Sequence, residues 1–385
     1  MPDAPRLFVH VGLQKTGTSY LQAALLRSRA DLASQGLDLV PPTKRQSFEL
    51  MVVIRDKYEA RRDPVSDRRI LERFTAQLER APGSRAVFSQ ESLAAAGPGQ
   101  ITRLLRASGG REVHVVATVR DLARQLPSSW QEQVKAGGTT AFRPYLRRLQ
   151  SLERSRSGRH PWIHLDPPAV LSRWAERVGP DRVHVVTVPP WDGPRTLLLE
   201  RFGAVLGVDP ARLEPEEHWS NASLGFAQAE LLRRINLELP EEVHRRYVYS
   251  DVVKQSFGAQ VLGTQERRRI RVPEEFRAWC EEVTERQVAE LESAGYQVVG
   301  SLKDLKCPES AFGAGDGEPT EHEVATASVS ALATMLGARG RAVASRRTGR
   351  IGVASRWRRM IRRLVSRKRP DVRATASARG RRHGP

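Results

Sequence analysis

Two kinds of hydrophobic pattern alternate along this chain. Short and nearly continuous apolar runs, rich in valine, occur at residues 7–11, 85–89, 113–119 and 183–188. Runs of this kind predict strands that are buried on both faces of a parallel sheet. Between them, apolar residues recur every three or four positions, which predicts helices. The alternation predicts an α/β fold with a mostly parallel central sheet and helices packed against it.

The remainder of the chain is predicted to be helical and then extended. Residues 224–237, 241–257 and 274–294 have helical patterns, and residues 296–299 read as a last short strand. We therefore expect a folded domain over residues 1–306, with a helical C-terminal part. A Gly-, Pro- and Glu-containing stretch follows and predicts a linker over 307–338, and the Arg-rich residues 339–385 are predicted to be a disordered tail.

The first predicted strand leads into a loop that is suited to binding an anion. Gly12 is followed by Gln14-Lys15-Thr16-Gly17-Thr18-Ser19, and a helical pattern begins immediately afterwards. Strand, glycine-containing loop and helix N-terminus together direct backbone amides and a helix dipole at a phosphate. The loop differs from the common nucleotide-binding motif, in which lysine follows the second glycine, because Lys15 precedes Gly17.

A second anion contact is predicted after the strand at 113–119. Arg120 stands at the end of that strand and Ser128 follows eight residues later, in the next helical segment. A guanidinium group and a hydroxyl group can bind one phosphate together. Taken alone, the pattern favours a simpler interpretation, in which Arg120 pairs with Asp121 or a carboxylate at the sheet edge and Ser128 is solvated. The carboxyl ends of parallel strands meet at one sheet edge, so the loop and Arg120 are expected to serve one ligand.

These two motifs resemble those of the sulfotransferase family. Lys-Thr-Gly-Thr-Ser resembles the family's 5′-phosphosulfate loop, with Gln14 in place of the usual proline and Ser19 in place of a threonine. Arg120 with Ser128 resembles its 3′-phosphate signature, and the resemblance to bacterial members spans about residues 6–306. It implies a P-loop-type, three-layer α/β/α domain that uses 3′-phosphoadenosine 5′-phosphosulfate (PAPS) and needs no metal.

The resemblance also implies roles for particular residues. Lys15 would assist departure of the leaving oxygen, and Glu91, after the strand at 85–89, would take the acceptor's proton, as a glutamate does in carbohydrate sulfotransferases. Glu91 could instead be only a first-turn acid of the following helix, and His164 with Asp166 form a rival base site. The predicted cosubstrate-binding residues are Gln14, Lys15, Thr16, Gly17, Thr18, Ser19, Arg120 and Ser128.

The predicted reaction moves a sulfuryl group from PAPS to a hydroxyl group, or an amine, by in-line displacement. The acceptor would be a carbohydrate, a glycolipid or a small metabolite. Two other functions remain open: an ATP-dependent P-loop kinase, and a non-catalytic nucleotide-binding protein. The position of Lys15 and the lack of a clear magnesium-binding aspartate at a strand end speak against the kinase.

Net charge adds a prediction about the tail. Residues 311–385 hold 17 Lys and Arg against 5 Asp and Glu, and so contribute +12 of the chain's +19. Residues 351–366 predict a basic amphipathic helix that suits an anionic membrane surface. A solvated Arg-rich extension is an equal alternative, and nucleic acid ranks below both. The N-terminus shows no signal peptide pattern, and we expect a cytoplasmic protein, peripheral at the inner membrane face if the tail binds lipid.

Overall fold

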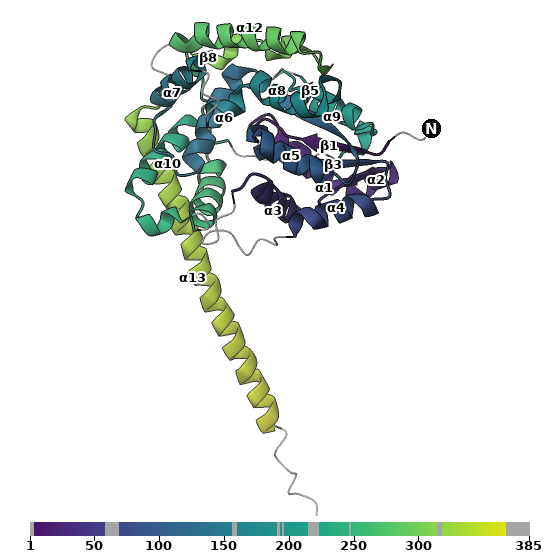
Figure 1. Ribbon diagram of the computed structural model, residues 1–385. Helices are drawn as coiled ribbons and strands as arrows, with labels where there is room; N and C mark the ends of the chain where they lie inside the picture. Colours follow the sequence, from purple (N-terminus) through teal and green to yellow (C-terminus); the bar gives the residue numbers. More distant parts are fainter. Residues whose placement is uncertain are drawn as a thin grey trace, which may run out of the picture. The chain divides into compact units, whose positions relative to one another are not determined.

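The computed structural model describes residues 4–57, 69–155, 160–190, 193–194, 196–214, 223–245, 248–313 and 318–366, with only the backbone described from residue 345 onward. The chain divides into two compact units, residues 1–328 and 329–385. The first unit contains a six-stranded sheet and its covering helices (Figure 1).

The sheet is parallel throughout and has the strand order β2-β3-β1-β4-β5-β7. Its strands are β1 (Arg6–His10), β2 (Leu37–Leu39), β3 (Arg85–Ser89), β4 (Glu112–Val119), β5 (Val183–Thr187) and β7 (Gln297–Val299). Because β1 lies between β3 and β4, the chain switches direction across the sheet at this point. Ligands of open parallel sheets bind at such switch points, beyond the carboxyl ends of the strands.

Helices cover both faces of the sheet, since alternate side chains of the buried strands point to opposite faces. One face packs against α1 (Thr18–Arg27), α2 (Arg29–Ser34) and α9 (Leu197–Leu206). The other packs against α3 (Lys44–Ile54), α4 (Ile70–Arg80), α5 (Pro98–Arg106) and α8 (Pro167–Val178). The three layers enclose an apolar core on each side of the sheet.

The rest of the first unit is mainly helical. It consists of α6 (Leu122–Lys135), α7 (Phe142–Arg154), α10 (Phe226–Glu238), the π-helix η6 (Tyr249–Ala259) and α12 (Arg277–Ser293). A two-stranded parallel pair, β6 (Val272–Pro273) with β8 (Phe312–Gly313), completes it. Helix α6 follows β4 directly, so it extends from the strand that ends beside the loop after β1.

The predicted fold class is confirmed: the structure is an α/β/α domain with a parallel central sheet and a helical C-terminal part. The four valine-rich runs form β1, β3, β4 and β5 to within one residue at either end. The sequence analysis did not predict β2 and β6, which are three and two residues long. Strands this short carry little periodicity, and the three-residue β7 is the short strand that coincides with a predicted one, at 296–299. The neighbouring strand decides how such segments pair.

The segments predicted as linker and disordered tail differ from the structure. Residue 306 does not end the first unit, since Phe312 is buried in β8 and Val324 and Ala327 are also buried. Helix α13 then runs from Glu321 to Ser366, through the linker predicted at 307–338 and into the tail predicted from 339. No proline interrupts the sequence between residues 319 and 370, and its Ala, Leu, Met and Arg residues are good helix formers.

The second unit, residues 329–385, is described from Val329 to Ser366 as the greater part of this helix. The predicted amphipathic helix at 351–366 falls within it, but its side chains lie outside the described ones, so the amphipathic character stays a prediction. Among the helices described, none combines the length and the apolar character that are needed to cross a membrane.

Candidate functional site

Three residues of the loop after β1 have a left-handed backbone conformation, and two of them are glycines. Gly12 has φ 71°, Lys15 φ 67° and Gly17 φ 88°. A Cβ atom at Gly12 would lie 2.7 Å from Cβ of Glu91, so any other residue there would collide with the segment after β3. Lys15 carries a full side chain in this conformation, which costs about 1–2 kcal/mol. Gly17 is the N-cap residue of α1 and closes the loop.

A buried chain of polar groups holds the loop against the sheet. The hydroxyl of Thr16 donates to the carbonyl of Leu13 (2.6 Å) and lies 2.6 Å from the hydroxyl of Thr118. His10 lies between Thr118 (3.3 Å from Nε2) and Ser89 (2.8 Å from Nδ1). Burial lowers the pKa of His10 to about 3, so the ring is neutral. If the Thr16 hydroxyl donates to Leu13, Thr118 donates to Thr16, and His10 must carry its proton on Nε2.

This arrangement changes the predicted role of one loop residue. Thr16 is among the predicted cosubstrate-binding residues, but its side chain is fully buried and points into the sheet. Its hydroxyl therefore fixes the loop. The correction has a physical reason: β1 and β4 are adjacent, and Thr118 of β4 supplies a hydroxyl within hydrogen-bonding distance.

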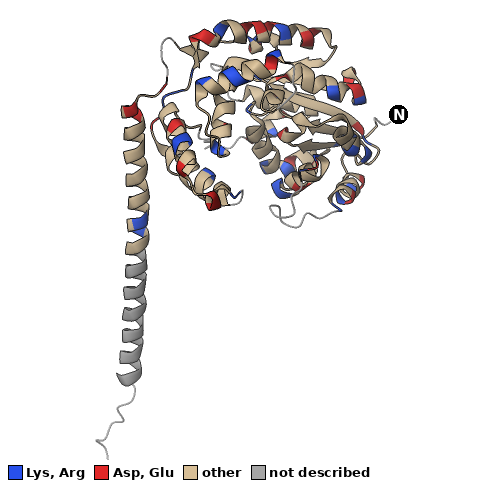
Figure 2. Ribbon diagram, turned by 60° about the vertical axis from the view of Figure 1, so that its left-hand side comes forward, with Lys and Arg blue, Asp and Glu red and all other residues tan. Residues whose placement is uncertain are grey.

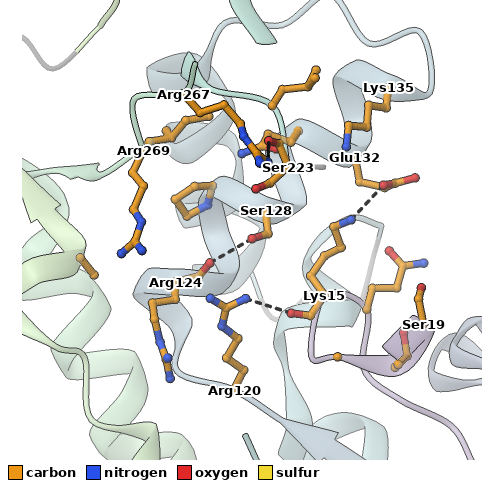
Figure 3. Close-up of a pocket in the computed structure, with 18 of the residues that line it drawn as sticks. Lys15, Ser19, Arg120, Arg124, Ser128, Glu132, Lys135, Ser223, Arg267 and Arg269 are labelled. Atoms are coloured by element: carbon orange, nitrogen blue, oxygen red, sulfur yellow. Dashed lines mark hydrogen bonds and ion pairs between the residues drawn. The ribbon is translucent and has the colours of Figure 1, made fainter. Parts of the chain in front are cut away.

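A cavity of about 970 Å³ opens beyond the carboxyl ends of β1, β3 and β4. It brings together residues from several widely separated stretches of the chain (Figure 3). The sequence-predicted residues that line it are Gln14, Lys15, Gly17, Thr18, Ser19, Glu91, Arg120 and Ser128. The loop, Arg120 with Ser128, and Glu91 thus face one space.

Arg120 lines the cavity beside the loop after β1. Its Nη1 donates to the carbonyl oxygen of Lys15 (3.3 Å), which joins the second predicted contact to the loop. Its Nε is buried and has no hydrogen-bond partner within the described part of the chain. Burial lowers the pKa of Arg120 to about 10, although Asp121 acts in the opposite direction. A buried donor without a partner is costly, and an anionic group in the cavity would relieve that cost.

The alternative interpretation was an ion pair between Arg120 and Asp121. In the described part of the chain, the carboxylate of Asp121 pairs with Arg124 instead. The Asp121 carboxylate caps α6 by accepting from the Arg124 amide (2.9 Å), and it also accepts from the Arg124 side chain. One turn further on, the Ser128 hydroxyl lies on the cavity wall and donates to the carbonyl of Arg124 (3.3 Å). The cap thus directs α6 so that Arg120 and Ser128 face the same ligand space.

Helix α6 is also tied to the loop. Nε2 of Gln125, a buried side chain, donates to the carbonyl of Gln14 (2.7 Å) and to that of His164 (3.0 Å). These two bonds connect the loop, α6 and the segment before α8. The two predicted anion contacts are therefore parts of one hydrogen-bonded framework.

Glu91 stands at the shared wall of two cavities. It begins a short 3-10 helix (Glu91–Ala95) after β3, and its carboxylate accepts from Nε2 of Gln22 (2.8 Å). Besides the large cavity, Glu91 lines a smaller one of about 220 Å³. Apolar groups on that side include Leu25, Leu39 and Phe48. A carboxylate at this position can contact a ligand in each cavity.

The rival base site does not line either cavity. His164 is buried in a 3-10 helix (Trp162–Leu165), and burial, reinforced by the nearby charge of His160, lowers its pKa to about 3. Asp166 caps α8 by accepting from the Ala169 amide (3.2 Å). Neither residue is among those that line the two cavities.

The structure adds cavity residues that the sequence analysis missed. They are Arg124, Gln131, Glu132 and Lys135 of α6, Lys254 of η6, and Arg267, Arg268, Arg269 and Arg271 before β6. In Figure 3, Arg267 and Arg269 lie on one side of Ser128 and Lys15 lies on the other. The run RRRIR at residues 267–271 was a visible signal, whereas Lys254 lies in a helical pattern without any motif.

The charge of the lining strongly favours an anionic ligand. Lysines and arginines greatly outnumber its two carboxylates, Glu91 and Glu132. Lys135 shows the consequence: burial and the neighbouring Lys15 lower its pKa to about 8, and Glu132 only partly opposes them. Like charges gathered in one space lower each other's affinity for protons. Among the described residues, no three His, Cys, Asp or Glu side chains are grouped in a way that could hold a metal ion.

Comparison with known proteins gives one likeness. Neither the protein-family models nor the curated proteins contain a match to this chain. Among solved structures, a sulfotransferase from Alicyclobacillus acidocaldarius is similar, with 16% identity and a TM-score of 0.40. The match covers 77% of this chain and 97% of that one.

Proposed function

We propose that the chain is a sulfotransferase that binds PAPS in the large cavity and transfers its sulfuryl group to an acceptor hydroxyl or amine. One observation carries the proposal: two separate anion contacts, the loop at Gln14–Ser19 and Arg120 with Ser128, line one cavity and are joined by a hydrogen bond. A ligand with anionic groups at both ends matches two such contacts. PAPS has a 3′-phosphate at one end and a phosphosulfate at the other.

The donor set fits this cosubstrate. The buried Nε of Arg120 and the hydroxyl of Ser128 would hold the 3′-phosphate. Gln14, Lys15, Gly17, Thr18 and Ser19, with the backbone of Thr16, would hold the phosphosulfate at the N-terminus of α1. PAPS supplies an activated sulfuryl group when it is bound. The ammonium of Lys15 would neutralise the charge that develops on the bridging oxygen.

Glu91 is proposed as the base that accepts the acceptor's proton. It faces the cosubstrate cavity and also the smaller cavity, whose wall includes apolar and hydroxyl-bearing side chains. An acceptor that enters from the smaller cavity would bring its hydroxyl between Glu91 and Lys15. Carbohydrates, glycolipids and small hydroxylated metabolites all carry such a group.

The kinase and the non-catalytic binding protein remain the competing functions. A kinase would bind ATP with magnesium in the same cavity. A non-catalytic protein would bind the nucleotide without turnover. Lys15 and Glu91 both face the cavity, which favours catalysis over binding alone.

A thermal-shift measurement tests the identity of the nucleotide. We expect 3′,5′-adenosine bisphosphate (PAP), the product that PAPS leaves behind, to stabilise the protein by about 2.7 kcal/mol at 100 times its Kd. Adenosine 5′-monophosphate, which lacks the 3′-phosphate, is the matched control and should stabilise less. Stabilisation by ATP with magnesium, and none by PAP, would favour the kinase.

The proposal extends to a membrane surface as the partner of α13. Val329, Leu332 and Leu336 follow a spacing of three and four residues, and each is more than half exposed: 67%, 59% and 71%. Met335 and Val343 are exposed as well. Spacing of this kind places side chains along one side of a helix. In the sequence the apolar positions continue at Val353, Trp357, Met360, Ile361, Leu364 and Val365.

The positive charge of α13 favours an anionic lipid surface as the partner of its exposed apolar side. The described portion of α13 has acidic residues only in its first turn (Figure 2). From residue 324 to residue 366 the sequence has ten arginines and no acid. A second copy of the helix would bring like charges together, whereas an anionic bilayer attracts each basic residue by about 1 kcal/mol. Apolar side chains on one side can enter the interfacial region.

Vesicle flotation tests this partner with the full-length protein. We expect flotation with vesicles containing phosphatidylserine and much less with vesicles of phosphatidylcholine alone. The double variant Leu332→Asp, Leu336→Asp should lose flotation, because both side chains are exposed and would carry charge into the lipid. Leu237→Asp, at a residue 57% exposed on α10, is the matched control. Full flotation of the double variant, or retention of the protein by nucleic acid in preference to vesicles, would contradict the proposal.

A further inference from the structure

A single carboxylate pairs two lysines inside the cavity. Glu132 lies on α6, one turn after Ser128. Its Oε2 accepts from Nζ of Lys15 at 3.0 Å, and its Oε1 accepts from Nζ of Lys254 at 2.6 Å. Figure 3 shows the first of these bonds and the position of Lys135 beside it. The lysine proposed to assist the leaving group is therefore held by an acid of the protein itself.

The three partners come from distant parts of the chain. Lys15 belongs to the loop after β1, Glu132 to α6, and Lys254 to η6. All three are about one-third exposed, with side-chain exposures of 28%, 32% and 39%. Their contact joins the loop to the helical C-terminal part across the cavity wall. It lies where a ligand held by Lys15 would have to approach.

The charge state of Glu132 follows from its surroundings. Burial alone would raise the pKa of this carboxyl, but Lys15 and Lys254 outweigh burial and bring the pKa down to about 2. Glu132 is thus ionised at any pH at which the protein would be studied. Its pKa is far too low for a useful proton acceptor near neutral pH, which separates it from the role proposed for Glu91.

We propose that Glu132 is a positioning residue that acts as an internal counter-anion for Lys15 and Lys254. Its carboxylate holds both ammonium groups at the cavity wall, and an anionic ligand must compete with it for them. The identification of that ligand with PAPS and PAP rests on the proposed function. The pairing of the two lysines by Glu132 does not.

This exchange has a consequence for affinity. When the ligand's anionic group pairs with Lys15 and Lys254, the carboxylate of Glu132 remains nearby and repels that group. The wild-type protein therefore binds the ligand less tightly than its lysines alone would permit. In return, Lys15 stays ordered in an orientation that faces the cavity. A long, flexible lysine otherwise loses side-chain entropy when it binds a ligand.

Lysine reactivity tests the pairing without any nucleotide. In Glu132→Gln the side chain keeps its size and loses its charge, so a carboxylate no longer holds the amines of Lys15 and Lys254. A charge-assisted hydrogen bond to a carboxylate hinders the attack of a lysine amine on an acylating reagent, so both lysines should react faster without it. Mass spectrometry should therefore find faster acetylation at both lysines. Unchanged acetylation at both would overturn the inference.

Glu153→Gln is the matched control for the loss of an ion pair. Glu153 accepts from Arg286 (2.5 Å) and from the indole of Trp279 (3.3 Å), and it does not line the cavity. Its removal should leave the acetylation of Lys15 and Lys254 unchanged. A rise equal to that in Glu132→Gln would mean that a general loosening of the fold exposes the lysines, and it would overturn the inference.

Calorimetry with PAP tests the competition. We expect Glu132→Gln to bind PAP about tenfold more tightly than the wild type, with the difference shrinking at high salt. Glu132→Asp keeps the charge and should bind PAP nearly as the wild type does, which keeps the test valid if the Gln variant folds poorly. Equal or weaker PAP binding by a folded Glu132→Gln variant, or clearly tighter binding by Glu132→Asp than by the wild type, would overturn the inference. Failure of the wild type to bind PAP would instead count against the proposed function, and the acetylation result would still decide the pairing.

Discussion

Glu91→Gln should lower turnover by roughly 10²–10⁴-fold, the usual contribution of acid–base catalysis. Glutamine keeps the size of the side chain and its contact with Gln22. It cannot accept the proton that an acceptor hydroxyl loses as it attacks. Because Glu91 would act on the acceptor, PAP affinity and the melting temperature should stay nearly unchanged. Initial rates with labelled PAPS and calorimetry with PAP measure the two quantities separately.

The contrast with Lys15→Ala makes this test specific. Lys15 would contact the cosubstrate in both the ground state and the transition state, so its removal should weaken PAP binding as well as turnover. A variant with a damaged fold would lose both quantities at either position. Near-normal turnover of Glu91→Gln on a true acceptor would show that Glu91 is only the first-turn acid of its 3-10 helix.

Arg120→Ala should weaken PAP binding by about 1.5–3 kcal/mol, or roughly 10- to 150-fold, as expected for a charge-assisted hydrogen bond. The substitution removes the buried Nε that has no partner in the described residues, together with the bond to the carbonyl of Lys15. Arg120→Lys should restore only part of the affinity, because an ammonium lacks the planar pair of donors. Titration calorimetry measures each loss.

Arg173→Ala is the matched control for this prediction. Arg173 is also a partly buried arginine that binds backbone carbonyls, those of Ala94 (3.0 Å) and Ala169 (2.7 Å), and it is not among the residues that line the cavity. Its loss should lower stability and leave PAP binding unchanged. Unchanged PAP affinity in Arg120→Ala would place the 3′-phosphate elsewhere, with the arginines at 267–271 as the next candidates.

The local features of the fold could be predicted because they depend on neighbouring residues. The valine-rich runs predict β1, β3, β4 and β5, since strands buried on both faces need apolar side chains at every position. The place of the loop after β1 could be predicted from Gly12 and Gly17, because left-handed backbone conformations and a helix N-terminus leave a local signature. The spacing of Arg120 and Ser128 likewise follows from one strand end and the first turns of α6.

The tail shows where local composition misleads. The Gly, Pro and Glu content of residues 307–338 and the arginines of residues 339–385 predicted a linker and a disordered tail, yet the helix Glu321–Ser366 runs through most of the first segment and into the second. Charge composition reports whether a segment can bury a core, whereas helix formation depends on backbone propensity and the absence of proline. This segment therefore forms a helix although its composition does not favour a buried core.

By itself, the sequence determined the α/β layers and the loop after β1, and it proposed Lys15, Arg120, Ser128 and Glu91 as candidate residues. Only the tertiary structure decided which of these face a common cavity, and that the hydroxyl of Thr16 points instead into the sheet. Only the tertiary structure shows that Lys254 and Glu132, which are 122 residues apart in the sequence, form an ion pair. It also shows that the arginines at 267–271 line the cavity. The physical reason is the range of the interactions. Periodicity and turns arise between near neighbours, whereas ion pairs across a cavity depend on how distant elements pack.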